Sequence, residues 1–187
     1  LAITDHGVMY GVIDFYKAAK EVGIKPILGC EVYVAPGSRF DKQPGESESR
    51  YYHLVLLAEN NTGYKNLMKI VSRGFTEGFY YKPRVDKEVL REYHDGIIAT
   101  SACLAGEVQR YLSRGMYETA RDVALELQDI FGKGNFFLEL QDHGIAEQHY
   151  VNPQLMRMHK ETGIELVCTN DVHYTYADDV DAHDILL

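Results

Sequence analysis

Asp171 and His173 place a carboxylate and an imidazole two residues apart, directly after the apolar run 166–168. Side chains two residues apart point to the same side of an extended backbone, so both groups can face one ligand. Carboxylate oxygen and imidazole nitrogen are donors that suit Zn, Mn and Fe. In parallel α/β proteins, ligands and metals bind at the carboxyl ends of the strands. We therefore expect Asp171 and His173 to be metal ligands at the end of a buried strand.

Four more residues of metal-binding type lie at the ends of predicted strands: His6, Glu31, His53 and Cys103. Taken singly, His6 could belong to a helix cap, His53 could be a core histidine, and Cys103 could be a small buried hydrophobe. Glu31 lies inside an apolar strand and needs a partner, because an unpaired buried carboxylate is costly. The joint pattern favours one metal site, reached if the strand ends converge at one rim. A thiolate from Cys103 favours Zn over Mg.

Other polar groups are weaker candidates. The sequence Gln141-Asp142-His143 could line the same rim or cap a helix. Lys82 and Arg84, in the aromatic and basic stretch 78–84, could bind a phosphate, although a solvated loop is the plainer interpretation. The acidic cluster 178–184 around His183 is typical of a helix start, where the helix dipole favours negative charge.

Composition and charge limit the classes of function. The 187 residues have 45% hydrophobic and 25% charged content and a net charge of −9, which disfavours a broad nucleic-acid-binding face. Three widely spaced cysteines argue against a disulfide framework and favour a reducing, cytoplasmic setting. We expect no membrane segment and no signal peptide. Because the chain opens with Leu1 in what resembles the end of a strand, we expect a fragment that lacks an earlier strand.

The predicted elements alternate between strands and helices, which favours an α/β fold with βαβ units and a parallel sheet. Without a Gly-rich dinucleotide motif, six such units favour a barrel over an open sheet. We expect one domain over residues 1–187, with a mobile loop at 36–50. Predicted strands are 1–3, 25–34, 52–58, 96–100, 135–140 and 165–168, and predicted helices are 10–22, 60–75, 86–93, 106–113, 117–131, 146–162 and one from 178.

The same residues resemble the motifs of the polymerase and histidinol phosphatase (PHP) family. The matching segments are Thr4-Asp5-His6, Gly29-Cys30-Glu31, the strand-borne His53, Ser101-Ala102-Cys103-Leu104 and Asn170-Asp171-Val172-His173. Residues 1–35, 63–75 and 100–108 are similar to the branch of this family found in bacterial replicative DNA polymerases. The resemblance spans essentially the whole chain.

The resemblance implies a distorted (β/α)₇ TIM-like barrel, here lacking its first strand, with up to three divalent metal ions (Zn, Mn or Mg). His6 and His173 would bind one metal, Asp171 would join it, and Glu31 would bridge to a second held by His53 and Cys103. His6, Glu31, Asp171 and His173 would be catalytic. The family's H-x-H motif and the ligand that follows it are absent from this sequence.

The implied activity is metal-dependent phosphodiester hydrolysis, with 3′-to-5′ exonuclease proofreading at the 3′ end of DNA reached through the intact polymerase. The alternative is a catalytically inactive, metal-stabilised structural module that supports the polymerase core and binds a separate proofreading subunit of the replicative holoenzyme. A small-molecule phosphatase such as histidinol phosphatase ranks last, because residues 63–75 and 106–114 match the polymerase branch better.

Overall fold

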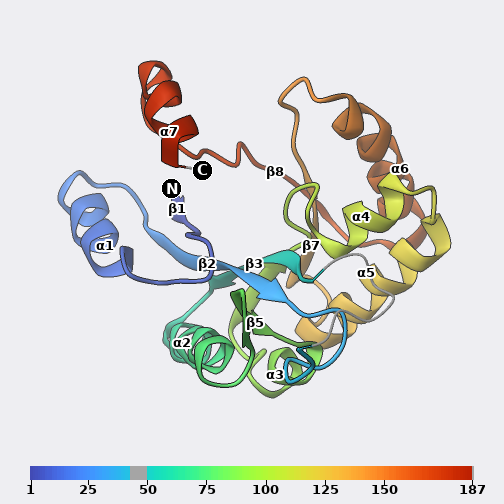
Figure 1. Ribbon diagram of the computed structural model, residues 1–187, viewed down its shortest axis with the longest axis horizontal. Helices are drawn as coiled ribbons and strands as arrows, with labels where there is room; N and C mark the ends of the chain where they lie inside the picture. Colours follow the sequence, from blue (N-terminus) through green and yellow to red (C-terminus); the bar gives the residue numbers. More distant parts are fainter. Residues whose placement is uncertain (43–49, 187) are drawn as a thin grey trace.

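The structure, a computed structural model, describes residues 1–42 and 50–186 (Figure 1). Its strands are β1 (Ala2–Ile3), β2 (Ile27–Val34), β3 (Tyr52–Ala58), β4 (Phe79–Tyr80), β5 (Lys82–Val85), β6 (Ile97–Thr100), β7 (Phe136–Leu140) and β8 (Leu166–Cys168). Its helices are α1 (Val12–Glu21), α2 (Asn61–Thr76), α3 (Lys87–Glu92), α4 (Glu107–Ser113), α5 (Tyr117–Phe131), α6 (Ala146–Thr162), the 3-10 turn η1 (Ala177–Asp179) and α7 (Val180–Leu186). Across these ranges, every helix is too short or too polar to cross a lipid bilayer.

The strands form one curled sheet with helices around its outer side (Figure 1). Its order is β4-β5-β2-β3-β6-β7-β8, and β1 pairs with the start of β2. Within the described ranges, β8 pairs only with β7 and β1 only with β2, so the sheet curls without closing. The predicted α/β barrel is therefore confirmed in an open, partial form.

Local sequence signals set most element boundaries. The side chain of Asn60 accepts a hydrogen bond from Gly63 N and begins α2, and Asp86 caps α3 in the same way through Val89 N. Helix α6 ends at Gly163, whose φ of 72° is left-handed and favours glycine. Helices α1 to α6 each bury residues on one face, whereas α7 has no buried residue.

The core lies between the sheet and these helices. Leu56 on β3, Leu67 and Ile70 on α2 and Phe136 on β7 are almost completely buried in one hydrophobic cluster. Burying side chains of this size contributes about 1.5–3 kcal/mol each before the entropy of folding is counted. Because β2 is buried on both faces from Gly29 to Val34, any charged group on it lies in the interior.

The sheet is not all parallel, contrary to the prediction. β3 runs antiparallel to both β2 and β6, whereas the β1–β2, β2–β5, β6–β7 and β7–β8 pairs are parallel. A parallel neighbour needs a crossover, usually a helix, and the described parts of the connection from β2 to β3 contain none. As a result, the start of β3 lies at the same rim as the end of β2, with Tyr33 opposite His53.

The stretch 78–84 is also more regular than predicted. It forms β4 and β5, which pair antiparallel through Phe79–Pro83 and Tyr80–Lys82. Tyr81 turns the chain with a φ of 61°, and β5 then pairs with β2 at Arg84 and Val85. Pro83 pairs with Phe79 of the edge strand β4, and the pairing of β5 with β2 begins only at Arg84.

Arg39 connects the segment after β2 to α2 and α3. Of the predicted mobile loop 36–50, residues 43–49 lie outside the described residues, but Arg39 is 5% exposed. Its guanidinium group donates to Asp86 at 3.0 Å, to Glu77 at 2.6 Å and to Glu88 at 3.0 Å. Asp86 is also buried, so Arg39 is the cation that makes its charge tolerable.

We therefore predict that Arg39→Met lowers the free energy of unfolding by about 3–5 kcal/mol, because it leaves the Asp86 carboxylate buried without a cation. Arg91→Met is the matched control. Arg91 pairs with Glu126 and Asp129 at the surface, where such pairs contribute about 1 kcal/mol or less. Urea unfolding followed by circular dichroism measures both variants, and equal losses would contradict the assignment.

Candidate metal centre

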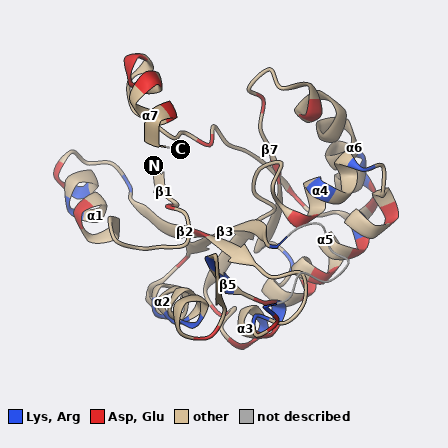
Figure 2. Ribbon diagram, viewed as in Figure 1, with Lys and Arg blue, Asp and Glu red and all other residues tan. Residues whose placement is uncertain are grey.

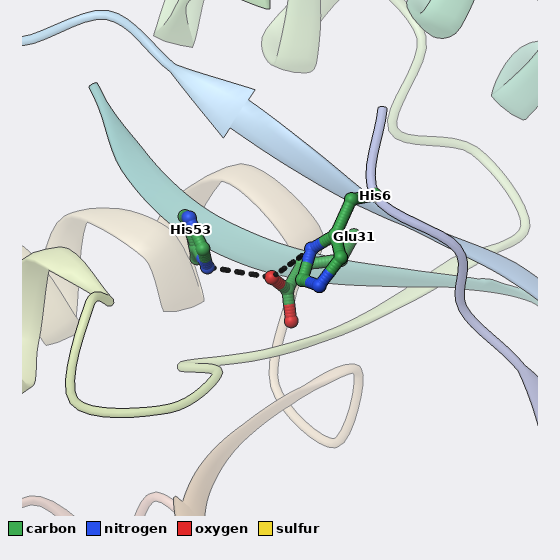
Figure 3. A group of neighbouring side chains, drawn as sticks. All are labelled: His6, Glu31 and His53. Atoms are coloured by element: carbon green, nitrogen blue, oxygen red, sulfur yellow. Dashed lines mark ion pairs between the residues drawn. The ribbon is translucent and has the colours of Figure 1, made fainter. Parts of the chain in front are cut away.

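Glu31 lies at the centre of the candidate site (Figure 3). Its side chain is on β2 and is almost fully buried, and its Oε1 is approached by two imidazoles. The Nδ1 of His53, at the start of β3, is 2.6 Å from this oxygen, and the Nδ1 of His6, after β1, is 2.9 Å from it. The ligand atoms of these three residues all lie within 4.8 Å of one another. Three chain segments therefore supply one compact group of metal-ligand type.

Backbone pairing fixes His6 beside Glu31. Glu31 N donates to Asp5 O at 3.1 Å, and Gly7 N donates to Glu31 O at 2.9 Å. Gly7 has a φ of 69°, and a Cβ there would lie 2.8 Å from Tyr33 Cε2. Only glycine meets both conditions without strain. The Asp5-His6-Gly7 segment is thus a close fit against β2, which aims His6 at Glu31.

The antiparallel register brings in His53. Tyr33 faces His53 directly across the β2–β3 ladder, so Glu31 and His53 are diagonal neighbours on one face of the sheet. Had β3 run parallel, its first residues would lie at the opposite rim. His53 is therefore part of the centre because it lies at the start of its strand, whereas Glu31 lies within β2 and the other ligand candidates follow their strands.

The electrostatics of this group suit a cation. Burial favours the neutral form of Glu31, but the approach of His53 and His6 outweighs burial and holds the Glu31 pKa at about 2. The carboxylate of Glu31 conversely raises the pKa of His6 above its ordinary value. Although both nitrogens are close, neither meets hydrogen-bond geometry, and the buried Oε1 accepts no hydrogen bond. An orphaned anionic oxygen facing two imidazole nitrogens fits a divalent metal ion.

Cys103 lies next to this group on the loop after β6. Its Sγ is 3.6 Å from His53 Nδ1, and burial raises its thiol pKa to about 11. Gln109 holds the loop by donating from Nε2 to Ser101 Oγ at 2.7 Å and to Ala102 O at 3.0 Å. The sulfur would become a thiolate ligand on binding a metal ion, because coordination displaces the thiol proton.

His173 and Asp171 lie on the other side of His6. His173 Nε2 faces His6 Nε2 at 3.5 Å, and His173 Nδ1 donates to the backbone oxygen of Asp171 at 2.8 Å. That hydrogen bond leaves His173 Nε2 as the lone-pair nitrogen, the form in which histidine binds metals. Asp171 has a φ of 44°, and both residues line a cleft of about 260 Å³ shared with His6 and Glu31.

The structure thus places all six predicted ligand residues around one rim. His6, Glu31 and His53 form the compact group, Cys103 adjoins His53, and His173 adjoins His6. The Asp171 carboxylate lines the cleft but is 3.9 Å from the nearest nitrogen of His173. Sequence reasoning set aside His183, whose ring centre lies 5.8 Å from that of His173.

The weaker candidates have mostly structural partners. His143 Nε2 donates to Asn170 O at 2.8 Å, so it supports the backbone just before Asp171. Arg84 is buried and donates to the carbonyl oxygens of Gly78 and Asp41, among others. The preferred interpretation of a solvated loop is therefore wrong for Arg84, and the alternative of phosphate binding is not supported either, because backbone oxygens of the neighbouring loops accept its hydrogen bonds. Lys82 remains exposed.

Tyr33 is a neighbour of the site that sequence reasoning missed. Its ring stacks on His6 with 6.4 Å between ring centres and meets His53 edge-on at 5.4 Å. Burial raises its pKa to about 12, so it stays neutral. Its position two residues after Glu31 on an extended strand was the available signal, since that spacing puts both side chains on one face.

Comparison with known proteins agrees with this geometry. The family model described as "PHP domain" matches residues 1–143. The chain is similar over its whole length to DNA polymerase III subunit alpha of Treponema pallidum (49% identical), Borreliella burgdorferi (46%) and Thermus aquaticus (45%). It covers only 16%, 16% and 15% of those proteins, respectively. A family match over most of the residues, with the family's motifs gathered at one rim, shows that this chain belongs to the PHP domain family.

Proposed function

We propose that this chain is the PHP domain of a bacterial replicative DNA polymerase, and that it hydrolyses the terminal phosphodiester bond at the 3′ end of DNA with divalent metal ions. The observation that carries the proposal is the buried Oε1 of Glu31. This oxygen lies within 2.9 Å of two imidazole nitrogens and accepts no hydrogen bond. The similarity of this chain, over its whole length, to part of the polymerase subunits supports the choice of DNA as substrate.

In this proposal the residues have distinct roles. Glu31, His53 and Cys103 would hold one metal ion, and His6, His173 and Asp171 would hold another, with Glu31 shared between them. Bound metal ions supply a hydroxide near neutral pH and positive charge that stabilises the leaving oxygen. The cleft beside His6 and His173 is open, so a phosphodiester can reach the centre. Cys103 favours Zn at its position over Mg.

We predict that Glu31→Gln lowers the affinity for Zn or Mn at least about tenfold, because it removes the one carboxylate of the described residues that lies within reach of both His6 and His53. Metal content after equilibrium dialysis, measured by atomic emission, gives the result. Glu165→Gln, at an exposed position before β8, is the matched control and should keep the metal content of the unaltered chain. Equal metal content in both variants would refute the assignment of Glu31.

We further predict that the polymerase carrying this chain shortens a 3′-mismatched primer when loaded with Mn or Zn. Glu31→Gln should reduce the rate of shortening about a hundredfold or more, which is the scale of losing one metal-dependent electrostatic interaction in a transition state. Primer extension should stay within about twofold in the same preparation. If the metal-loaded, unaltered polymerase leaves the mismatched primer intact, the nuclease proposal is wrong.

The separate chain segments that supply the ligands favour a second function. His6 follows β1, Glu31 is on β2 and His53 begins β3, so metal ions that share Glu31 would cross-link three segments of the sheet. Metal binding of this kind adds to the free energy of folding. The domain would then be a catalytically inactive, metal-stabilised module that supports the polymerase core and binds a separate proofreading subunit.

Metal removal separates the two functions. The structural function predicts that a chelator lowers the thermal midpoint of the unaltered polymerase by several degrees, since each 1 kcal/mol shifts a domain of this size by about 2–4 °C. Glu31→Gln should already have the lower midpoint and should not respond to chelator. Differential scanning calorimetry measures both. A lower midpoint without any primer shortening would favour the structural function, and an unchanged midpoint would exclude it.

A further inference from the structure

Lys82 is a positive charge beside the metal centre that the fold does not use. It is the exposed first residue of β5, and its Nζ lies 5.6 Å from the centre of the Tyr33 ring. The same Tyr33 ring stacks on His6. Lys87 has two carboxylate partners, whereas no carboxylate of the described residues lies within ion-pair distance of Lys82. The ammonium group of Lys82 is therefore available to an external anion.

The position of Lys82 is fixed by its surroundings. The turn at Tyr81 pairs Lys82 with Tyr80, and the parallel register of Arg84 with Tyr33 puts Lys82 level with Glu31 on the neighbouring strand. Pro83 packs against Gly7, because a Cβ added to Gly7 would lie 3.0 Å from Pro83 Cγ. The strand that carries Lys82 is thus packed against the segment that carries His6.

Arg84 shows why Lys82 differs from the other cation of β5. Arg84 points inward and is 4% exposed, and its guanidinium group donates hydrogen bonds to backbone oxygens. Lys82 has none of these contacts. Two residues apart on one strand, one cation holds the loops together and the other extends to the rim of the metal centre.

The negative net charge of the chain bears on which ligand Lys82 could bind. The chain has a net charge of −9, and Figure 2 shows acidic and basic positions mixed over the outer helices, while β5 carries only basic charges. Such a field repels a polynucleotide, so a local cation beside the centre lowers the cost of bringing phosphates to it. The Nζ of Lys82 faces the Tyr33 ring, and that ring stacks on His6, so the positive charge lies beside the centre.

We propose that Lys82 binds a phosphate of a polynucleotide next to the phosphodiester that the metal centre holds. Lys82 contacts the ring of Tyr33 rather than any of the three ligand residues, so its ammonium group is offset from the ligand atoms. The position of the ammonium group suits a phosphate next to the scissile phosphodiester better than the scissile phosphodiester itself. The inference rests on the proposed function and adds which residue binds the phosphate next to the scissile one.

The test uses the full-length polymerase and two probes, a hydrolysis-resistant phosphorothioate trinucleotide and inorganic phosphate. Each dissociation constant is measured by calorimetry with Zn-loaded and with metal-stripped protein, so that the metal-dependent part reports this centre. Lys82→Ala should weaken metal-dependent trinucleotide binding about tenfold, the usual effect of losing one charge-assisted hydrogen bond. It should leave phosphate binding and Zn content within about twofold.

Lys82→Arg should restore most of the trinucleotide affinity, and Lys160→Ala, at an exposed position on α6, should change neither probe. Unchanged trinucleotide affinity in Lys82→Ala overturns the proposal, as does an equal loss for inorganic phosphate, which would place Lys82 on the scissile group. Absence of metal-dependent trinucleotide binding in the unaltered protein overturns it too. None of these results depends on primer shortening, so an inactive nuclease leaves the test decisive.

Discussion

A buried negative charge at the rim of the sheet governs the organisation of this chain. Glu31 lies on the part of β2 that is buried on both faces, where a carboxylate is tolerated only with compensating charge. The chain supplies two imidazoles rather than a lysine or arginine, and both aim nitrogens at one oxygen. Imidazole nitrogens and a carboxylate oxygen are also a donor set that suits a divalent cation. The local structure is therefore arranged for an ion as well as for packing.

Reversal of one strand makes that arrangement possible. In a fully parallel sheet, ligands come from strand ends, and the loops that follow them are long and variable. β3 enters the sheet from the same rim and places His53 on the strand itself, next to Tyr33 in the ladder. One ligand is thus fixed by six registered residue pairs. The exception to the parallel pattern coincides with the most tightly held part of the centre.

Much of the fold was predictable because its signals are local. Asn60 and Asp86 as caps, Gly163 as a terminator and the apolar run in β3 depend on neighbours within a few residues. The direction of β3 and the pairing of β4 with β5 depend on partners far along the chain, so the pattern of residues did not reveal them. The residue types of the ligands were predictable because they follow from short local motifs. The contact of Tyr33 with His6 and the inward direction of Arg84 depend on tertiary packing, so the sequence did not reveal them.

The two sides of the centre differ in how firmly the backbone holds them. β1 and the bridge at His6 join this segment to β2 through three residue pairs, and Gly7 N donates to Glu31 O, whereas β2 and β3 pair through six residues. Local opening costs less free energy where fewer backbone pairs must break. Glu31 and His53 thus belong to the longer ladder, and His6 is held by the shorter one. Amide hydrogens around His6 would consequently exchange with solvent sooner than those of β2 and β3, and an ion would gain or lose its coordination first on that side.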